Sequence, residues 1–410
     1  MLEKYIPKRF ATAMIKHVIA ATLFFPYIYS HNENWHYQDF ILPNFFAILA
    51  MVFIFTSWKL DFKRNAIFVS GLGILLLAYN ICATYMNVKY HHWYGEQINT
   101  TISFLFFMVL LMVKDIHALI DTATIKATIH MIVASNVLAI CFRLFTGYNR
   151  IIIINDWVRL ETYSESTQEQ FAWLYGHKSE YGLLLVLCVA FFVTQRKYFK
   201  NIFTYVLSLG MLFVALYVSD SYTAMGASLL IFGGQFLDYL VTAKWWKKII
   251  TALALPLLFL PFSKKLLTEM DANRELLTLN GRTNIWSSFI DHIKNNPRGF
   301  IGTFGEAQFT FDSPLPWTVY TNNAHNVFFN HMLRFSILVG GIFFLLCLII
   351  SLFAIKQNLS FKTLCIWISL FILLIMDHSL TTIEFSYVLL FIFCIFFINS
   401  TKSKAYYRSK

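Results

Sequence analysis

The chain has 410 residues, of which 58% are hydrophobic and only 13% are charged, and 43 are phenylalanines. This composition is outside the usual range of soluble globular proteins, so we expect lipid to be the main solvent of the chain. The formal net charge is +11, but the basic residues form short clusters between apolar segments and no single patch, which argues against a nucleic-acid partner. All cysteines lie inside apolar segments, which argues against a disulfide framework or a metal site.

Apolar segments long enough to cross a bilayer recur along the whole chain, and no long polar linker divides it. The first follows Lys4, Lys8 and Arg9 as a signal peptide would, but no small-residue cleavage site follows, so we expect it to stay as a span. In chain order the predicted spans cover residues 12–29, 40–58, 66–86, 98–113, 122–146, 179–195, 201–218, 223–241, 248–262, 326–355, 363–379 and 385–400. We therefore predict one all-α integral membrane domain, residues 1–410, with about twelve transmembrane helices.

The connections between the predicted spans alternate in charge. Basic residues follow every second span, in the connections 59–64, 114–126, 196–200, 244–248 and 356–362 and in the tail. The opposite connections, such as 30–39 and 377–384, contain no Lys or Arg. Because cytoplasmic loops carry the excess of Lys and Arg, both termini are predicted to be cytoplasmic.

This orientation places two longer polar segments on the outer face of the membrane. One is a shorter loop, 147–178, and the other is a large extracytoplasmic loop, 263–325, between predicted spans nine and ten. Basic residues are disfavoured in short translocated loops, whereas long loops escape this rule and hold ordinary solvated charges, so each basic residue here has a functional and a plain explanation. The basic residues on this side are Arg150, Arg159, Lys178, Lys264, Lys265, Arg274, Arg282, Lys294, Arg298 and Arg334.

Residues 282–295 place apolar side chains at helical spacing, with turn-forming residues on both sides. An amphipathic helix on or in the membrane surface fits this pattern. Its first turn would combine free backbone amides, the positive end of the helix dipole and the guanidinium of Arg282, which together suit a phosphate group. The alternative is that Arg282 pairs with the nearby Glu275 or Asp271.

Polar residues recur at spacings of three or four where the long loop enters the tenth predicted span: Asn323, Asn326, Asn330 and Arg334. A polar stripe at the outer end of a transmembrane helix is expected to face a cavity rather than lipid. His325 lies at the mouth of that cavity. A neutral imidazole accepts a proton near neutral pH, which predicts a general base, and the alternative is a capping or interfacial histidine.

Several short motifs follow one another across residues 279–341. They are Leu279-Asn280-Gly281-Arg282, Trp286, Asn296-Pro297-Arg298-Gly299, Ala324-His325-Asn326, and Gly340-Gly341 in the next apolar span. Their order resembles the O-antigen polymerase and O-antigen ligase superfamily. The general plan of the whole chain is similar too, with about twelve spans, cytoplasmic termini and one large outer loop before the tenth span.

The resemblance implies a metal-independent, cofactor-free inverting glycosyltransferase of the bacterial cytoplasmic membrane. It would transfer an undecaprenyl-diphosphate-linked glycan to an acceptor sugar hydroxyl at the outer face. Arg282 would hold the diphosphate and His325 would deprotonate or orient the hydroxyl, and Arg298, Asn326 and Arg334 are further substrate-binding candidates. The lipid bilayer, the lipid-linked glycan, and a flippase and chain-length regulator of the same pathway are the implied partners.

The chain departs from the superfamily at one position. Members usually carry an Arg in a Ser-x-Ser-Arg stretch at the outer start of the eighth span, where this chain has Ser219-Asp220-Ser221-Tyr222. Tyr222 therefore stands where a cation is expected. Arg159 or Lys178 would supply the missing charge from the shorter outer loop, unless they are membrane-interface anchors. Asp220 is an alternative candidate that would orient an arginine or a sugar hydroxyl.

Three functions stay open at this point. A polymerase, which we prefer, extends the glycan by a repeat, whereas a ligase hands the finished glycan to a lipid core or a protein, and both use the same donor. A transporter such as a lipid-linked oligosaccharide flippase is the alternative from another class. Charged residues in mid-span and short Gly- or Pro-broken segments repeated in two halves would favour a transporter, but here the charges gather in outer loops and the two halves show no repeat.

Overall fold

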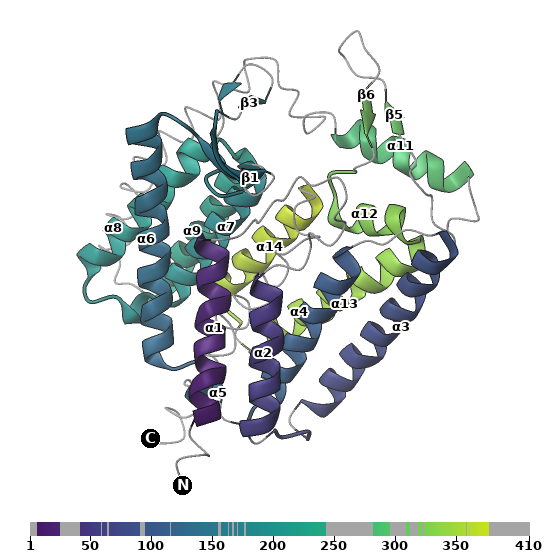
Figure 1. Ribbon diagram of the computed structural model, residues 1–410, viewed down its shortest axis with the longest axis horizontal. Helices are drawn as coiled ribbons and strands as arrows, with labels where there is room; N and C mark the ends of the chain where they lie inside the picture. The colour runs from purple at the N-terminus through teal and green to yellow at the C-terminus, as the bar shows by residue number, and fades with distance from the viewer. Residues whose placement is uncertain are drawn as a thin grey trace.

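The computed structural model shows a helical bundle with small β-hairpins at one end (Figure 1). It describes residues 6–24, 42–58, 60–63, 65–90, 95–114, 116–154, 157–162, 164–165, 168–169, 171–175, 178–242, 282–295, 309–311, 319–321, 324–357 and 359–376. Within these residues, the strands form three two-stranded antiparallel sheets.

The first group of helices covers the N-terminal part of the chain. Its members are α1 (Ile6–Phe24), α2 (Leu42–Ser57), α3 (Ala66–Tyr90), α4 (Gly95–Met112), α5 (Ile116–Leu119) and α6 (Thr122–Thr146). Helix α1 packs against α2 and α6, and α2 and α3 both pack against α4. Local signals set the bounds of α6: the Asp121 carboxylate accepts a hydrogen bond from the Thr124 amide (2.7 Å), and Gly147 ends the helix in the left-handed conformation.

The second group surrounds a fully buried helix. It comprises α7 (Lys178–Thr194), the 3-10 turn η1 (Arg196–Tyr198), α8 (Ile202–Ser219) and α9 (Tyr222–Thr242). Every residue of α7 from Ser179 to Thr194 is buried, as expected for a helix that is apolar on all sides. The strands between α6 and α7 are β1 (Arg150–Ile154), β2 (Trp157–Glu161), β3 (Ser164–Glu165) and β4 (Gln168–Glu169).

The third group joins the other two. It contains α11 (Arg282–Asn295), β5 (Phe309–Phe311), β6 (Val319–Thr321), α12 (Val327–Arg334), α13 (Ile337–Gln357) and α14 (Phe361–Met376). Helix α13 packs against α3, and α14 packs against α9. In Figure 1, α14 therefore lies in the middle of the molecule, between the α7–α9 region and α12.

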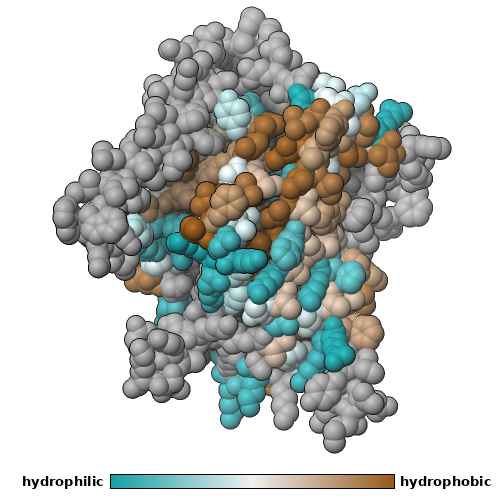
Figure 2. Space-filling model, turned by 90° about the vertical axis from the view of Figure 1, so that its left-hand side faces the viewer, coloured by the Kyte–Doolittle hydropathy of each residue, from teal (hydrophilic) through white to brown (hydrophobic). Residues whose placement is uncertain are grey.

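Several helices suit a membrane. Five of those described, α3, α6, α8, α9 and α13, contain a segment long and apolar enough to cross a bilayer, and α2, α4 and α14 contain shorter apolar segments. Figure 2 shows a broad hydrophobic surface on the side where α6 and α8 lie, where exposed side chains include Leu138, Leu144, Phe203 and Val206. The prediction of a mostly helical chain with several apolar helices long enough to span a membrane is confirmed. The total of about twelve spans stays a prediction, and the predicted spans 248–262 and 385–400 lie outside the described residues.

The tenth predicted span, 326–355, was wrong as a single helix. Helix α12 ends at Arg334, and α13 begins at Ile337 after a short break. The Ser336 side chain accepts a hydrogen bond from the amide of Val339 (3.2 Å), which caps the new helix. Hydropathy alone does not reveal this break because apolar residues continue on both sides of it.

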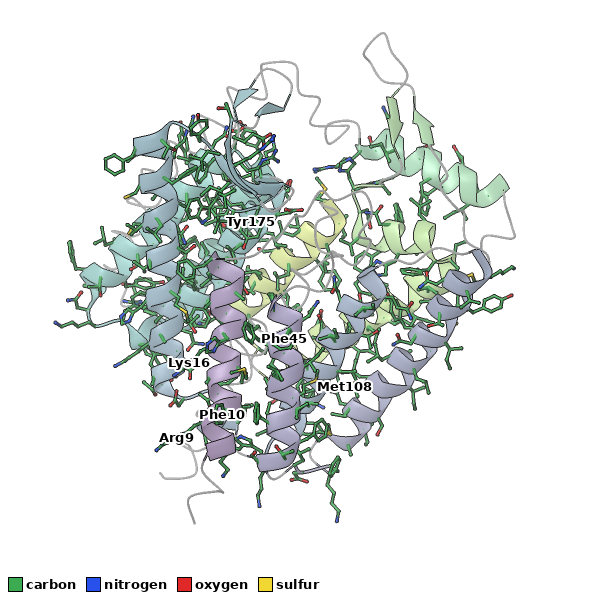
Figure 3. The ribbon with its side chains drawn as sticks, in the orientation of Figure 1. Arg9, Phe10, Lys16, Phe45, Met108 and Tyr175 are labelled. Carbon is green, nitrogen blue, oxygen red and sulfur yellow. The ribbon has the colours of Figure 1, made fainter. Side chains whose placement is uncertain are left out.

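The basic connections that the structure describes lie at one end of the bundle. A hydrogen bond of 2.8 Å from the Asp61 amide to the Met112 carbonyl joins the α2–α3 connection to the end of α4. Figure 3 shows Arg9 at this end of the molecule, near the start of α1, and Tyr175 toward the opposite end. Helix α11 and the hairpins lie at the opposite end, with the start of α7 and the start of α9 (Figure 1).

Candidate functional site

His325 lies in a turn whose two flanking residues are held by asparagine side chains. The side-chain oxygen of Asn326 accepts hydrogen bonds from the amides two and three residues further on (3.0 and 3.2 Å), which caps α12. The side-chain oxygen of Asn330 accepts a hydrogen bond from the amide of Ala324 (2.8 Å). His325 itself has a φ of 47°, in the left-handed region that few non-glycine residues adopt. Its backbone is therefore fixed from both sides, and its side chain is half-buried.

These contacts give two residues of the polar stripe a structural role. Asn326 and Asn330 are only 5% and 2% exposed, and their side-chain oxygens bond to backbone amides of the turn. Both side chains therefore position the turn, and the cavity expected beside the stripe stays a prediction. Asn323 lies outside the described residues, and Arg334 is the last residue of α12.

Helix α11 packs directly on this turn. The sequence predicts the helix over residues 282–295, and the structure has it with these bounds. Ile285 and Phe289 of α11 are buried, and the rings of Phe289 and Phe329 lie 4.6 Å apart. The indole Nε1 of Trp286 donates a hydrogen bond to the carbonyl oxygen of Ala324 (2.9 Å).

The hydrogen bond of Trp286 brings the start of α11 close to His325. Arg282 is the first residue of α11 and lies one turn before Trp286, a rise of roughly 6 Å along the helix axis. Residues at this spacing share a helix face, so Arg282 and Trp286 lie one above the other on α11. The structure thus brings the two proposed catalytic residues into one region, and both are half-buried. Glu275 and Asp271, the alternative partners of Arg282, lie outside the described residues.

A close helix approach positions α12. A Cβ added to Gly340 of α13 would lie 2.9 Å from the backbone nitrogen of Met332 and 3.1 Å from the carbonyl oxygen of Phe328. Only a residue without a Cβ permits this approach. Gly341, the second glycine of the motif, has open space around it. The glycine that matters for the site is therefore Gly340, because it lets α12 lie against α13.

Lys178 and Tyr222 belong to a second polar region, formed by the adjoining starts of α7 and α9. Lys178 is the first residue of α7, and Tyr222 is the first residue of α9. The two helix starts are in close contact, since a Cβ on Gly182 would lie 2.7 Å from the Ser221 hydroxyl oxygen. The hydroxyl of Tyr222 donates a hydrogen bond to the carboxylate of Asp220 (3.0 Å), which has a φ of 58°. Tyr222, which stands where a cation was expected, thus orients the carboxylate of Asp220.

Arg159 is exposed on strand β2, opposite Ile152 of β1. The neighbouring Arg150 uses its charge within the same hairpin, with its Nε 3.0 Å from the carboxylate of Glu161. A hydrogen bond of 2.8 Å from the Ile151 amide to the Trp173 carbonyl joins the hairpin to the segment just before α7. Arg159 is therefore on the same end of the bundle as Lys178, and Arg298 lies outside the described residues.

Helix α14 connects the two polar regions. The Ser369 hydroxyl of α14 donates a hydrogen bond to the Ala227 carbonyl of α9 (2.8 Å). On its other side, Phe371 of α14 stacks with Phe328 of α12, with ring centroids 6.5 Å apart. The pair Arg282 and His325 and the pair Lys178 and Tyr222 thus lie at one end of the bundle, with α14 packed between the helices that carry them (Figure 1).

Sequence reasoning did not find every residue that shapes this region. The roles of Trp286 and Asn330 depend on contacts across 38 and 6 residues, and no local pattern predicts them. A second histidine, His331, is 1% exposed and stacks on Phe343 with ring centroids 3.9 Å apart, so it is not accessible to a substrate. Within the described ranges, no group of three or more His, Cys, Asp or Glu side chains gathers to hold a metal ion.

Comparison with known proteins adds no further assignment. No protein-family model matches this chain, and no curated protein matches its sequence.

Proposed function

We propose that the chain is a bacterial polysaccharide polymerase, which transfers a glycan from an undecaprenyl diphosphate to an acceptor sugar hydroxyl at the outer face of the cytoplasmic membrane. The single observation that supports this most is the 2.9 Å hydrogen bond between Trp286 and Ala324. It joins the two motifs on which the resemblance to O-antigen polymerases and ligases rests, although 38 residues separate them.

Arg282 has the chemistry to bind the leaving group. The donor leaves as a lipid diphosphate, which carries its own negative charge and needs a cation more than it needs a proton. The first turn of α11 places the guanidinium of Arg282 at the positive end of the helix dipole. Arginine suits this role because its planar donors bind two phosphate oxygens at once.

His325 has the chemistry to activate the acceptor. In the proposed reaction, the acceptor hydroxyl oxygen attacks the anomeric carbon from the side opposite the diphosphate. The bond from the anomeric carbon to the diphosphate oxygen breaks, so the configuration inverts, and the hydroxyl proton passes to the imidazole of His325. The turn supports this role because its hydrogen-bonded backbone limits the positions that the His325 side chain can take before the substrate binds.

The region around Lys178 and Tyr222 is the proposed binding site for the rest of the substrate. Lys178 would supply the positive charge that Tyr222 lacks, with Arg159 as the second candidate. The Asp220 carboxylate, which is held by Tyr222, suits a sugar hydroxyl as its partner.

The proposed orientation places this end of the bundle outside the cytoplasm, with about twelve spans and both termini inside. It is supported by the described basic connections, which lie at the end of the bundle opposite α11 (Figures 1 and 3). A flippase that delivers the lipid-linked repeat and a regulator of chain length are the proposed partners.

The glycan profile of a deletion strain tests the proposal. Loss of a polymerase leaves surface glycan with a single repeat, and we expect this result. Accumulation of long lipid-linked polymer would instead assign the ligase function, which uses the same donor chemistry. Normal surface chains, with lipid-linked repeats trapped on the inner face, would contradict both enzymes and indicate a flippase.

A further inference from the structure

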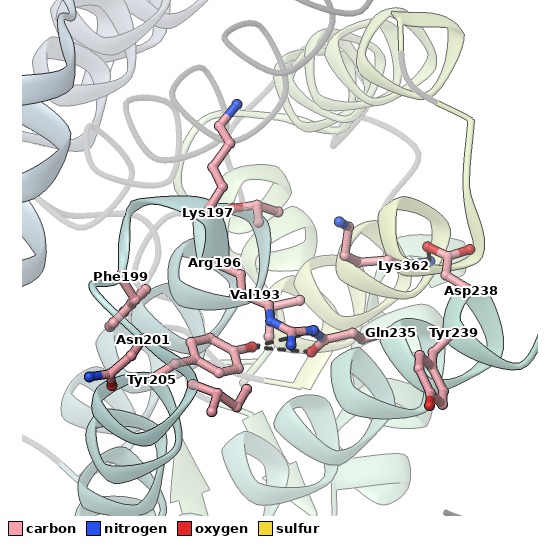
Figure 4. A pocket seen from close by; sticks show the side chains of 12 residues that line it. Val193, Arg196, Lys197, Phe199, Asn201, Tyr205, Gln235, Asp238, Tyr239 and Lys362 are labelled. Atoms are coloured by element: carbon pink, nitrogen blue, oxygen red, sulfur yellow. Dashed lines mark hydrogen bonds between the residues drawn. The ribbon is translucent and has the colours of Figure 1, made fainter. Parts of the chain in front are cut away.

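A basic pocket lies at the other end of α7 and α9, away from the candidate site. It has a volume of about 730 Å³ and is lined by the end of α7, the turn after it, the start of α8, the second half of α9 and the start of α14 (Figure 4). Helix α7 extends for 17 residues from Lys178 to Thr194, so the pocket lies roughly 24 Å from Lys178 along the helix axis. The pocket is therefore separate from the proposed glycosyl-transfer site.

The charged side chains of the pocket are mainly cationic. Three bases, Arg196, Lys197 and Lys362, line it, with Asp238 as the single acid among the lining residues. In Figure 4, Arg196 and Lys362 reach the centre of the pocket, whereas Lys197 extends away from it. This agrees with the position of the Lys197 amine, which lies 5.1 Å from the ring centroid of Tyr198.

The one acid leaves the pocket with an excess of positive charge. Both oxygens of Asp238 accept hydrogen bonds from backbone amides at the start of α14, from Phe361 (2.9 Å) and Lys362 (3.2 Å). Its carboxylate therefore caps a helix, and it also attracts the Lys362 amine. Because three bases and one acid line the pocket, the attraction of Asp238 does not balance the positive charge. Two cationic groups thus face the same pocket from different helices.

The base of the pocket offers further hydrogen-bonding groups. The guanidinium carbon of Arg196 lies 5.5 Å from the ring centroid of Tyr205, which restricts where the group can move. The hydroxyl of Tyr205 lies 3.4 Å from the side-chain amide of Gln235 (Figure 4). A planar guanidinium, an amine, a hydroxyl and an amide together match the oxygens of a phosphate group.

We propose that this pocket binds the phosphate group of an anionic phospholipid. The apolar surface beside it favours a lipid over a soluble phosphate. Ile202 lines the pocket and is 58% exposed, and Phe203 and Val206 on the same face of α8 are 71% and 58% exposed. An acyl chain can lie along these side chains while the head group occupies the pocket. Basic pockets between transmembrane helices bind lipid head groups in this way.

Binding of short-chain lipids to the purified, delipidated full-length protein tests this proposal. The probes are dioctanoyl phosphatidylglycerol, the zwitterionic dioctanoyl phosphatidylcholine and inorganic phosphate, measured by native mass spectrometry or by thermal stabilisation. We expect phosphatidylglycerol to bind at least ten-fold more tightly than phosphatidylcholine. The double variant Arg196→Gln/Lys362→Gln should weaken phosphatidylglycerol binding by about ten-fold or more, the loss of roughly 1.4 kcal/mol.

Two further variants keep the test decisive. Lys200→Gln removes an exposed charge of the same connection that does not line the pocket, and it should leave binding unchanged. Arg196→Gln alone alters an exposed residue at the start of the short 3-10 turn η1, so it should preserve folding and still weaken binding. Unchanged lipid binding by Arg196→Gln and the double variant would overturn the proposal. Equal stabilisation by inorganic phosphate would also overturn it and would assign a soluble phosphate instead.

Discussion

Arg282 and His325 are held by different kinds of structure. Arg282 begins a helix whose bounds and amphipathic pattern can be read from the sequence. His325 has a left-handed backbone that depends on hydrogen bonds of Asn330 and Asn326, and no local sequence rule predicts this conformation. The position of Arg282 was therefore easier to predict than the backbone conformation of His325.

Replacing Arg282 with Ala should abolish glycan assembly while the protein remains in the membrane. Loss of one charge-stabilising group from a transition state lowers the rate by about 10²–10³-fold. Arg282→Lys should recover part of the activity because it keeps the charge and loses only the two-pronged geometry. The matched control is Lys294→Ala, at the exposed end of the same helix, which should keep polymer length normal. Normal polymer from Arg282→Ala would remove the phosphate role.

Replacing His325 with Asn tests the base without disturbing the turn. Asparagine adopts the left-handed conformation more readily than most residues, so the φ of 47° remains accessible. Loss of a general base lowers the rate by about 10²–10⁴-fold, which is measured as the rate of polymer formation in membranes. If His325→Asn keeps full activity, the imidazole serves only the turn.

At the scale of elements, hydropathy predicts most helices well. Ten of the predicted spans fall on described residues, and nine of them coincide with single helices to within several residues, because each is a long apolar segment bounded by polar connections. The tenth span differs because α12 and α13 are both apolar, and only the cap at Ser336 and the contact at Gly340 separate them. Hydropathy also does not predict that α11 packs on α12, since this contact depends on side chains from distant segments.

The contact between α11 and the turn predicts an effect for Trp286→Phe. The new ring still packs against Phe329 but loses the hydrogen bond to the carbonyl of Ala324. Loss of one such bond costs about 1 kcal/mol, so we expect activity to fall by roughly five-fold through a displaced turn. The control is Ile290→Val on the exposed face of the same helix. Equal activity of Trp286→Phe and wild type would show that this bond does not position His325.

At the scale of the whole molecule, charge alternation and structure agree on two distinct ends. The described basic connections lie at one end of the bundle, and α11 with the described hairpins lies at the other (Figure 1). This separation follows from the sequence because successive predicted spans cross the membrane in opposite directions and basic residues follow every second span. How the helices pack, including the burial of α7 on every side, depends on neighbours that the sequence does not identify.

Labelling of introduced cysteines tests which end faces outward. Lys294→Cys on α11 and Lys200→Cys before α8 both place a thiol at an exposed position. A membrane-impermeant thiol reagent should label Lys294→Cys in intact spheroplasts and Lys200→Cys only after permeabilisation, with the parent protein as background. The reverse pattern would invert the topology and with it the proposed outer location of the site.

The most direct test of the central claim is a rate measurement on the purified protein with an undecaprenyl-diphosphate-linked repeat as donor and acceptor. Wild type should form polymer and release undecaprenyl diphosphate. The variants Arg282→Ala and His325→Asn should each lose most activity, and the double variant should be little worse than either, because two groups that serve one step do not contribute additively. Polymer formation by the double variant at the wild-type rate would contradict a shared site at Arg282 and His325.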